Sequence, residues 1–343
     1  MLIDIDLFVA KANNSLSACS IRRAGTVDKL QMKIKLLAIG EAMAELRESD
    51  NGGYDVGFAG DTFNTAVYCA RTLSSDKTSD TRSDNSFDNS VSFMSQIGMD
   101  PLSTSFKELA AKQTLNTAHI TRDPDLHIGI YSVSTDSDGE RSFHYWCNSS
   151  AARNMFMTDD QISSIPAATV IYLSGITLAI LSPAARQRLM VHLSHLSKNG
   201  KSLIAFDSNY RPRLWESREM AQQVISDMWS IADIALPSID DEMALFDEEN
   251  EDVAITRFSQ QQWSACAIKR GVRGPVSPGL PLQEHPQFRA AQSVVDTTAA
   301  GDSFNGAYLA CYLSGKTEAE CLSAAHACAS RVVGHRGAIV PQE

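Results

Sequence analysis

From Met32 onward, short apolar runs alternate with longer segments in which apolar residues recur every three or four positions. The first run, M-K-I-K-L-L-A-I-G-E, is typical of a buried strand that ends at glycine. Further strands are expected at Val91–Ile97, Thr169–Ser174, Ser202–Phe206, Ile234–Leu236 and Ser264–Lys269. Helices are expected from Thr62, from Pro101 with Asp100 as its cap, from Pro183, around Met243, and in two closing segments. This alternation predicts an α/β fold, a doubly wound and mostly parallel sheet with helices on both faces, whose ligands bind beyond the C-terminal strand ends.

One region interrupts the alternation. His127 to Ser134 and Arg141 to Asn148 are two strand-like runs joined by D-S-D-G-E, a strong hairpin signal. Together with the Gly52 to Gly57 segment they predict a small separate sheet, drawn from about residues 49–60 and 126–149. Such a sheet could close over a cleft as a lid and exclude water from a reacting group, although the pattern alone equally allows an ordinary surface hairpin. An exposed sheet also favours a homo-oligomer, in particular a dimer.

Two segments do not fit the predicted core. Residues 1–31 have no clear place in the fold and are expected to be a non-core extension, which leaves residues 32–343 as the main domain and Met32 as a plausible alternative start. Ser75 to Ser90 is rich in Ser, Asp, Thr and Asn, so it predicts a solvated loop that is dispensable for chemistry.

Composition narrows the classes of function. The 343-residue chain has a formal net charge of −11, and without a basic stripe this argues against binding to nucleic acid. No run approaches the roughly 20 apolar residues of a membrane span, and the N-terminus lacks the pattern of a secretory signal. The seven cysteines are scattered and odd in number, as expected for reduced thiols in a cytoplasmic protein. A few focused cations in a cleft would still allow acidic substrates to bind.

The most informative segment is Val295 to Ala307, V-D-T-T-A-A-G-D-S-F-N-G-A. A helix that begins at Gly301 would leave the N–H groups of Ala299, Ala300 and Gly301 free at its positive end, where a phosphate can approach small side chains closely. Asp302 would then stand beside the bound anion as a general base for a hydroxyl, a combination that suits phosphoryl transfer. The alternative is that this aspartate is only a favourable charge at a helix end.

The whole thirteen-residue run resembles the C-terminal signature of the ribokinase-like (PfkB) family of carbohydrate kinases, in which the aspartate is the catalytic base. Four other stretches resemble one branch of that family, the 2-keto-3-deoxygluconate kinases, especially the bacterial form: Gly57 to Thr65, Gly129 to Asn148, Tyr172 to Pro183, and Asp207 to Trp215. The resemblance covers the chain from Met32 to its end. It implies ATP-dependent phosphorylation of a keto-deoxy sugar acid, 2-keto-3-deoxygluconate, to its 6-phosphate.

The predicted sugar site draws on the start of the first helix. Gly60 and Asn64 lie where a strand gives way to a helix, so the backbone can approach a sugar while the amide binds its hydroxyls. Asp61 is expected to cap that helix, and the resemblance lets it bind substrate hydroxyls as well. On the predicted lid, the resemblance implies that Tyr131 contacts the substrate. Tyr145 lies on the partner strand and is a further candidate for binding the substrate, with packing as its alternative role.

Arg211 follows a predicted buried strand, and its planar guanidinium suits a carboxylate or a phosphate. The resemblance implies that it contacts the sugar acid and, with Asn209, the phosphates of ATP.

The remaining nucleotide residues are also implied by the resemblance. Lys269, Gly271 and Gly274 in K-R-G-V-R-G match the ATP-binding strand and turn, and Ala299 to Gly301 would bind the phosphates. The run S-I-D-D stands where the family usually has N-x-x-E, a motif that organises Mg²⁺ and phosphate, so Ser238 replaces an asparagine while Asp241 keeps the charge and is expected to hold the metal through water. A monovalent cation is left open as a further cofactor.

Two departures bear on the acceptor. Ala59 stands where the family commonly has glycine, and Cys147 stands where the similar kinases often carry arginine, which removes a positive charge near the predicted lid. Fructokinase or ribokinase specificity, and a catalytically weak sugar-acid sensor, therefore remain as alternatives. A nicotinamide-dependent dehydrogenase is poorly supported because no G-x-G-x-x-G follows the first strand.

Overall fold

The computed structural model describes residues 32–49, 52–75, 90–135 and 141–342. The predicted extension at residues 1–31, almost all of the polar loop between Ser75 and Ser90, and the turn of the predicted hairpin lie outside these residues. No helix in the described part of the chain is long and apolar enough to cross a membrane.

The predicted parallel sheet is confirmed. Its seven strands run in the order β11-β10-β9-β8-β1-β4-β5, and every neighbouring pair is parallel. Their bounds are β1 Leu36–Ile39, β4 Val91–Ile97, β5 Ile120–Arg122, β8 Val170–Ser174, β9 Leu203–Asp207, β10 Ile234–Ala235 and β11 Ala265–Cys266. The last strand is shorter than predicted, because after Cys266 only single bridges continue the pairing, Lys269 with Ser238 and Ile268 with Val276.

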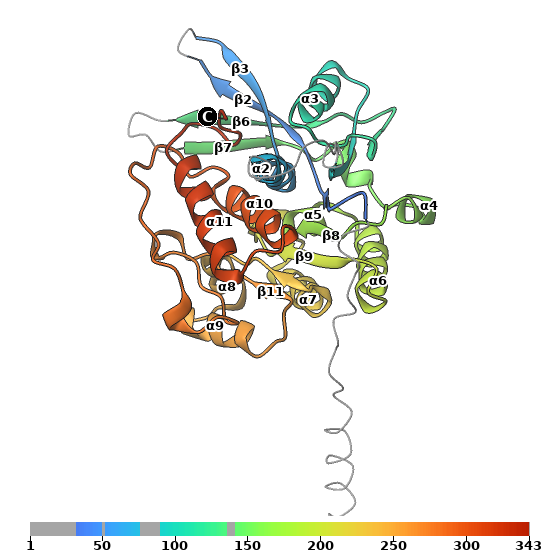
Figure 1. Ribbon diagram of the computed structural model, residues 1–343. Coiled ribbons are helices and arrows are strands. Elements are labelled where there is room, and N and C mark those ends of the chain that lie inside the picture. The colour runs from blue at the N-terminus through green and yellow to red at the C-terminus, as the bar shows by residue number, and fades with distance from the viewer. Residues whose placement is uncertain (1–31, 50–51, 76–89, 136–140, 343) are drawn as a thin grey trace, which may run out of the picture.

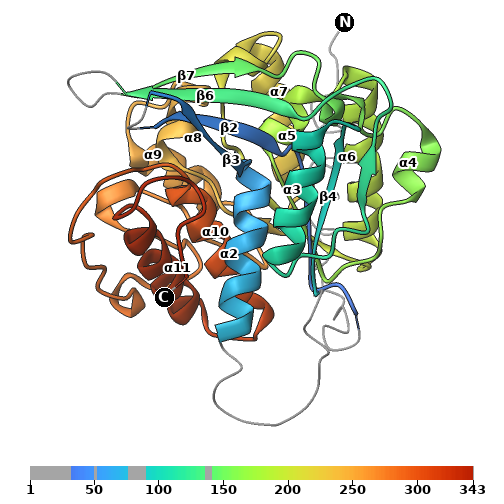
Figure 2. The same cartoon turned by 90° about the horizontal axis from the view of Figure 1, so that it is seen from above.

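The sheet separates two hydrophobic cores. In β1 the side chains of Leu36 and Ala38 belong to one core and those of Leu37 and Ile39 to the other, because successive residues of a strand face opposite sides. Helices α2 Asp61–Ser75, α3 Pro101–Lys112, α10 Ala300–Leu313 and α11 Glu318–Val332 cover the first face. The second face is covered by α5 Gly175–Ile180, α6 Pro183–Lys198, α7 Arg218–Ile231, α8 Ile239–Phe246 and α9 Glu251–Ser259 (Figures 1 and 2).

The helix starts follow the capping residues closely. Asp100 Oδ1 accepts a hydrogen bond from Ser103 N at 2.9 Å, as predicted for the cap of α3. Helices α2 and α10 each begin one residue before the predicted start, at Asp61 and Ala300. Short helices complete the described chain: α4 Asp159–Ser163, η3 Ala151–Asn154, η4 Pro212–Leu214, η5 Gly271–Arg273 and η6 Leu282–Glu284.

The predicted small sheet is also present, with one strand more than expected. Its order is β3-β2-β6-β7, with β3 Tyr54–Ala59, β6 Gly129–Thr135 and β7 Arg141–Trp146. The strand not predicted is β2, Met43–Glu48, which pairs antiparallel with β3 and parallel with β6 and so lies inside the sheet. Its sequence, M-A-E-L-R-E, carries charges that obscure the strand pattern, yet Glu45 is buried. In Figure 1 this sheet lies above α2 and α10.

The close packing of α10 against α2 depends on Gly306. A Cβ atom at this position would lie 2.5 Å from the carbonyl oxygen of Thr65 and 2.8 Å from Tyr68 Cβ, so the two helices approach through the space that glycine leaves. This contact fixes the N-terminal turn of α10 relative to that of α2.

We expect Gly306→Ala to lower the free energy of unfolding by about 1–3 kcal/mol, because overpacking outweighs the better helix propensity of alanine. Denaturant unfolding measures this change. The control is Gly279→Ala, an exposed position where the nearest atom to the added Cβ is 3.9 Å away. Equal stabilities of Gly306→Ala and the unmodified protein would contradict this account of the packing.

Candidate active site

Asp302 lies in the first turn of α10, where it meets α2. Asn64 Nδ2 of α2 donates a hydrogen bond to Asp302 Oδ2 at 2.8 Å, and Thr65 Oγ1 donates to the backbone oxygen of Asp302 at 3.2 Å. The structure therefore brings together two predicted site residues that are 238 positions apart. The asparagine holds one oxygen of the carboxylate, and no hydrogen bond from the described residues occupies the other oxygen.

The environment of Asp302 is acidic and largely dehydrated. Burial raises the pKa of this carboxyl to about 7; the negative charges of Asp61 and Asp207 act in the same direction, while Asn64 and Lys269 oppose the rise. A carboxylate with a pKa near neutrality can accept a proton during a reaction and release it afterwards. Asp302 thus has the position and the proton affinity of a general base.

The turn before α10 differs in detail from the prediction. Ala299 adopts a left-handed conformation with φ 60°, and the N–H of Ala300 donates to the carbonyl of Thr297 at 3.2 Å, so this N–H is not free. The N–H groups of Ala299 and Gly301 have no acceptor among the described residues, as expected at a helix start. Two of the three predicted donors therefore remain for an anion. We call Ala299 to Gly301 the anion turn.

Asp296 holds the approach to this turn, a role that the sequence analysis did not assign. Its Oδ1 accepts from Thr298 N at 2.9 Å and its Oδ2 accepts from Gly337 N at 2.7 Å. The carboxylate thereby ties the anion turn to the end of the chain.

The predicted sugar residues of α2 lie beside Asp302, with one correction. Asp61 is the first residue of the helix rather than its cap, since the carbonyl of Gly60 accepts the first helical hydrogen bond, from Asn64 N at 2.7 Å. A side chain at position 60 would begin 2.3 Å from the carbonyl oxygen of Glu41, which excludes larger residues. Asp61 Oδ2 accepts from Asn209 Nδ2 at 2.7 Å, and burial raises the pKa of this aspartate as well.

Arg211 and Asp241 form an ion pair with each other. Arg211 Nη1 lies 3.2 Å from Asp241 Oδ1 and 2.8 Å from the carbonyl oxygen of Tyr210, while half of the arginine side chain is exposed. The predicted anion ligand and the predicted metal ligand are thus partners here. Burial raises the pKa of Asp241 and the charge of Arg211 opposes this rise.

The two predicted lid tyrosines have different surroundings. Tyr131 is buried, donates its hydroxyl to Glu45 Oε2, and packs in a small cluster to which Ala299 also contributes. Tyr145 stacks on Tyr131 with ring centroids 5.7 Å apart and remains more than half exposed. Tyr131 thus shares a cluster with a residue of the anion turn, but its hydroxyl is already engaged within the small sheet.

A cavity of about 410 Å³ opens beside the start of α10. Five residues predicted to bind ATP line it: Ser238, Lys269, Gly271, Ala300 and Gly301. Apolar side chains that the sequence analysis missed form much of the remaining wall, namely Val272, Val294, Phe304, Ala329 and Val333. The shape and apolar character suit the base of a nucleotide whose phosphates point toward the helix start.

Four other residues predicted to bind ATP do not line this cavity: Gly274, Asn209, Arg211 and Ala299. Gly274 instead packs against the ring of Phe288, which a Cβ atom at that position would approach within 2.6 Å.

A buried polar network behind the site was not predicted. Lys269 Nζ donates to Asp207 Oδ2 at 2.5 Å and to Asn305 Oδ1 at 3.1 Å, and Asn305 Nδ2 donates to Asp207 Oδ2 and to the hydroxyl of Tyr172. A signal for Asp207 existed, because it directly ends a buried strand at the predicted ligand edge. Asn305 could have been found as the inward-facing residue one turn after Asp302.

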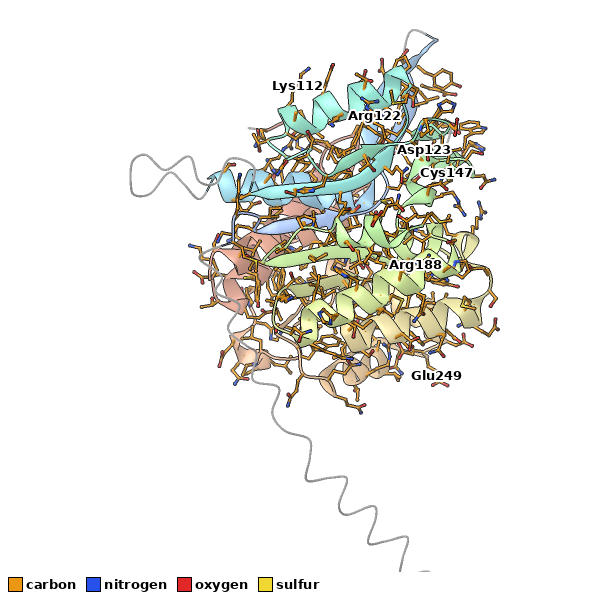
Figure 3. All side chains as sticks on the ribbon, turned by 90° about the vertical axis from the view of Figure 1, so that its right-hand side faces the viewer. Lys112, Arg122, Asp123, Cys147, Arg188 and Glu249 are labelled. Carbon is orange, nitrogen blue, oxygen red and sulfur yellow. The ribbon has the colours of Figure 1, made fainter. Side chains whose placement is uncertain are left out.

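Glu41 is a second functional candidate that the sequence analysis missed. It lies two residues after β1 and is buried. Burial raises its pKa to about 7, with Asp61 adding to the rise and Ser150 and Arg153 opposing it. Its Oε1 has no hydrogen-bond partner among the described residues. Cys147, which directly follows β7, is labelled in Figure 3. A Cβ atom at Gly129 would meet both Glu41 Oε1 and Cys147 Cβ, so the thiol and this carboxyl lie on the same side of Gly129.

The described residues contain no group of three or more His, Cys, Asp or Glu side chains that could enclose a metal ion. Asp241 is the carboxylate that was predicted to hold Mg²⁺. A single carboxylate fits a Mg²⁺ ion that takes its other ligands from water and phosphates, provided that the ion pair between Asp241 and Arg211 opens.

Residues 33–343 match the pfkB family of carbohydrate kinases. The 2-dehydro-3-deoxygluconokinase of Escherichia coli K12 is 37% identical over 325 residues, which cover 91% of this chain and 99% of that protein. The enzyme of the same name from Dickeya dadantii is 38% identical over 313 residues, covering 89% and 96%.

The crystal structure of 2-dehydro-3-deoxygluconokinase from Thermotoga maritima superposes with a TM-score of 0.70 at 20% identity, covering 90% of this chain and 96% of that one. At this identity the likeness supports the fold alone. The family match covers nearly the whole described chain, and it leads to one conclusion: this protein belongs to the pfkB family of carbohydrate kinases.

Proposed function

We propose that this protein transfers the γ-phosphoryl group of ATP to the terminal hydroxyl of 2-dehydro-3-deoxygluconate, also called 2-keto-3-deoxygluconate, and produces 2-keto-3-deoxy-6-phosphogluconate. The observation that carries the proposal is Asp302, a carboxylate of pKa about 7 that stands beside the anion turn. The choice of acceptor is supported by the relatives with this activity in their names, which are 37% and 38% identical over about nine tenths of the chain.

The proposed reaction needs few covalent steps. Asp302 accepts the proton of the sugar hydroxyl through the oxygen that Asn64 leaves unoccupied. The hydroxyl oxygen forms a bond to the γ-phosphorus while the bond from that phosphorus to the β–γ bridging oxygen breaks, and ADP leaves. The free N–H groups of Ala299 and Gly301 stabilise negative charge on the transferring group.

Polar groups around Asp302 would bind the sugar acid. Asp61 and Asn209 are joined at 2.7 Å and present a carboxylate and an amide that can bind substrate hydroxyls. Arg211 is half exposed, so it can turn from Asp241 toward the substrate carboxylate or a phosphate. The small sheet acts as the lid that limits the access of water.

Mg²⁺ belongs to the proposal as the companion of the nucleotide. When bound, it would neutralise phosphate charge and orient the γ-phosphoryl group, and Asp241 would hold it through water. Within the protein, Lys269, Ala300 and Gly301 line the cavity at the start of α10, where the phosphates would lie. A monovalent cation is a candidate for a further cofactor.

We also propose a dimer formed through the small sheet. Tyr54, Val56 and Trp146 of that sheet are each more than half exposed, an apolar surface that a second copy could cover. The six described cysteines are free thiols, which supports a reducing, cytoplasmic location.

Asp302→Asn should lower kcat by about 10²- to 10⁴-fold, the usual contribution of a general base, while the Kd for ATP changes by less than about threefold. A coupled assay for ADP and calorimetric titration with ATP measure the two effects. Asp227→Asn, at an exposed position of α7, is the control that should keep full activity. Near-normal turnover of Asp302→Asn would rule out the assignment of the base.

The pH profile offers a separate test. Since the base acts in its ionised form and its pKa is about 7, kcat/KM should be constant at higher pH and fall about tenfold per unit below pH 7. Steady-state rates between pH 5.5 and 9 report this limb. A profile that stays flat down to pH 5.5 would contradict the raised pKa.

A substrate panel decides the acceptor. We expect kcat/KM for 2-keto-3-deoxygluconate to exceed that for fructose, ribose and nucleosides by at least about tenfold, as differential binding of a carboxylate allows. Coupled ADP assays give the rates, and mass spectrometry identifies the product. Preference for fructose or ribose would favour the alternative sugar kinases, and binding of the acid without turnover would favour a sensor.

A further inference from the structure

We propose that Asn305 is a positioning residue for phosphoryl transfer, which holds the Lys269 ammonium ion at the wall of the nucleotide cavity, beside the anion turn. The inference rests on the proposed kinase function and adds a residue to it. Asn305 contacts neither the cavity nor Asp302 directly; it acts through the lysine.

The side chain of Asn305 is fully buried, and both ends of its amide are hydrogen-bonded to other side chains. Its Oδ1 accepts from Lys269 Nζ at 3.1 Å, and its Nδ2 donates to Asp207 Oδ2 at 2.7 Å and to the hydroxyl of Tyr172 at 3.0 Å. The partners fix the orientation of the amide, because an ammonium group can only donate and an ionised carboxylate can only accept. A flipped amide would lose two of these three hydrogen bonds.

Lys269 lies where a positive charge is useful to the reaction. Its Nζ is 3.6 Å from the point at which a side chain of Gly301 would begin, and the residue lines the nucleotide cavity together with Ala300 and Gly301. Asp207 and Asn305 take two of its three N–H donors. The third donor can reach a phosphate oxygen, and the charge already lowers the pKa of Asp302.

The neutral amide explains how this charge remains effective. Asp207, at the end of β9, attracts the ammonium ion away from α10. Asn305 gives Nζ an acceptor on the α10 side and, through Nδ2, shares the same carboxylate oxygen that binds the lysine. An uncharged acceptor holds a cation without cancelling it, whereas a second carboxylate would neutralise it. Without Asn305, the Lys269 ammonium ion keeps its 2.5 Å contact with Asp207 and is expected to pivot about it, away from the anion turn.

A double-mutant cycle with Lys269→Met tests whether Asn305 acts through the lysine. Asn305→Ala should lower kcat by about tenfold when Lys269 is present and by less than about twofold in the Lys269→Met background, the non-additivity expected of coupled residues. The acid limb of kcat/KM should shift to higher pH in Asn305→Ala, toward that of Lys269→Met, because less positive charge faces Asp302. Ser314→Ala, at the C-terminal end of α10, is the control that should leave both quantities unchanged.

A second variant guards against a simple folding defect. Tyr172→Phe removes the hydroxyl that accepts from Asn305 Nδ2 and leaves both bonds of Lys269 in place. It should lower kcat by about threefold, again only when Lys269 is present. Thermal unfolding of each variant shows whether the protein remains folded. Equal losses in both Lys269 backgrounds, or folded variants with unchanged kcat and pH profile, would overturn the inference.

Calorimetric titration with ATP separates this inference from the proposed function. Asn305→Ala should weaken ATP binding by about three- to tenfold in the Lys269 background only. If the unmodified protein phosphorylated none of the sugars, the proposed function would fail while this coupling could still be measured. If it is active and the coupling is absent in both turnover and binding, the inference on Asn305 alone fails.

Discussion

The buried ion pair between Lys269 and Asp207 is the interaction on which the site depends. Each side chain is at least nine tenths buried, so both charges have lost most of their hydration and need each other and Asn305 to compensate for it. Removal of one partner from such a pair commonly costs about 3–5 kcal/mol. The pair also joins the end of β9 to the segment that follows β11, and Asn305 extends it to α10. The three elements thus meet at one buried network beside Asp302 and the anion turn.

A geometric constraint complements this electrostatic one. Two carboxylates, Asp61 and Asp302, lie at the N-terminal ends of neighbouring helices, where the positive ends of the helix dipoles partly offset their mutual repulsion. The close approach of α2 and α10 at Gly306 keeps Asn64 within 2.8 Å of Asp302. The packing of α2 against α10 therefore has two opposing effects on the pKa of Asp302, which burial raises: the charge of Asp61 adds to the rise, and the hydrogen bond from Asn64 opposes it.

Features governed by local sequence could be predicted, and those governed by distant contacts could not. The strand Val91–Ile97, the cap at Asp100 and the turn before α10 each follow from a few adjacent residues. In contrast, Asn305 binds Asp207, 98 residues away, and Arg211 binds Asp241, 30 residues away. The local sequence pattern predicts neither contact. The strand β2 was missed because Glu45 and Arg47 suggest solvent, although pairing within the small sheet buries the glutamate. The network around Lys269 was not predicted, because the local sequence does not show that a lysine is paired with a buried carboxylate. Its partners, Asp207 and Asn305, are both distant in the sequence.

The small sheet and the cavity beside α10 are built from the chain in different ways. Strands β2 and β3 form one excursion from the central sheet and β6 and β7 form another, with α2, β4, α3 and β5 between them. The lining of the nucleotide cavity, by comparison, comes entirely from residues 238–333. A recombination event could exchange the nucleotide site through one contiguous segment, whereas transfer of the lid requires two matched insertions whose strands must still pair in register. The donor side of the proposed site thus lies on one contiguous segment of the chain, whereas the small sheet depends on the register between two separate excursions.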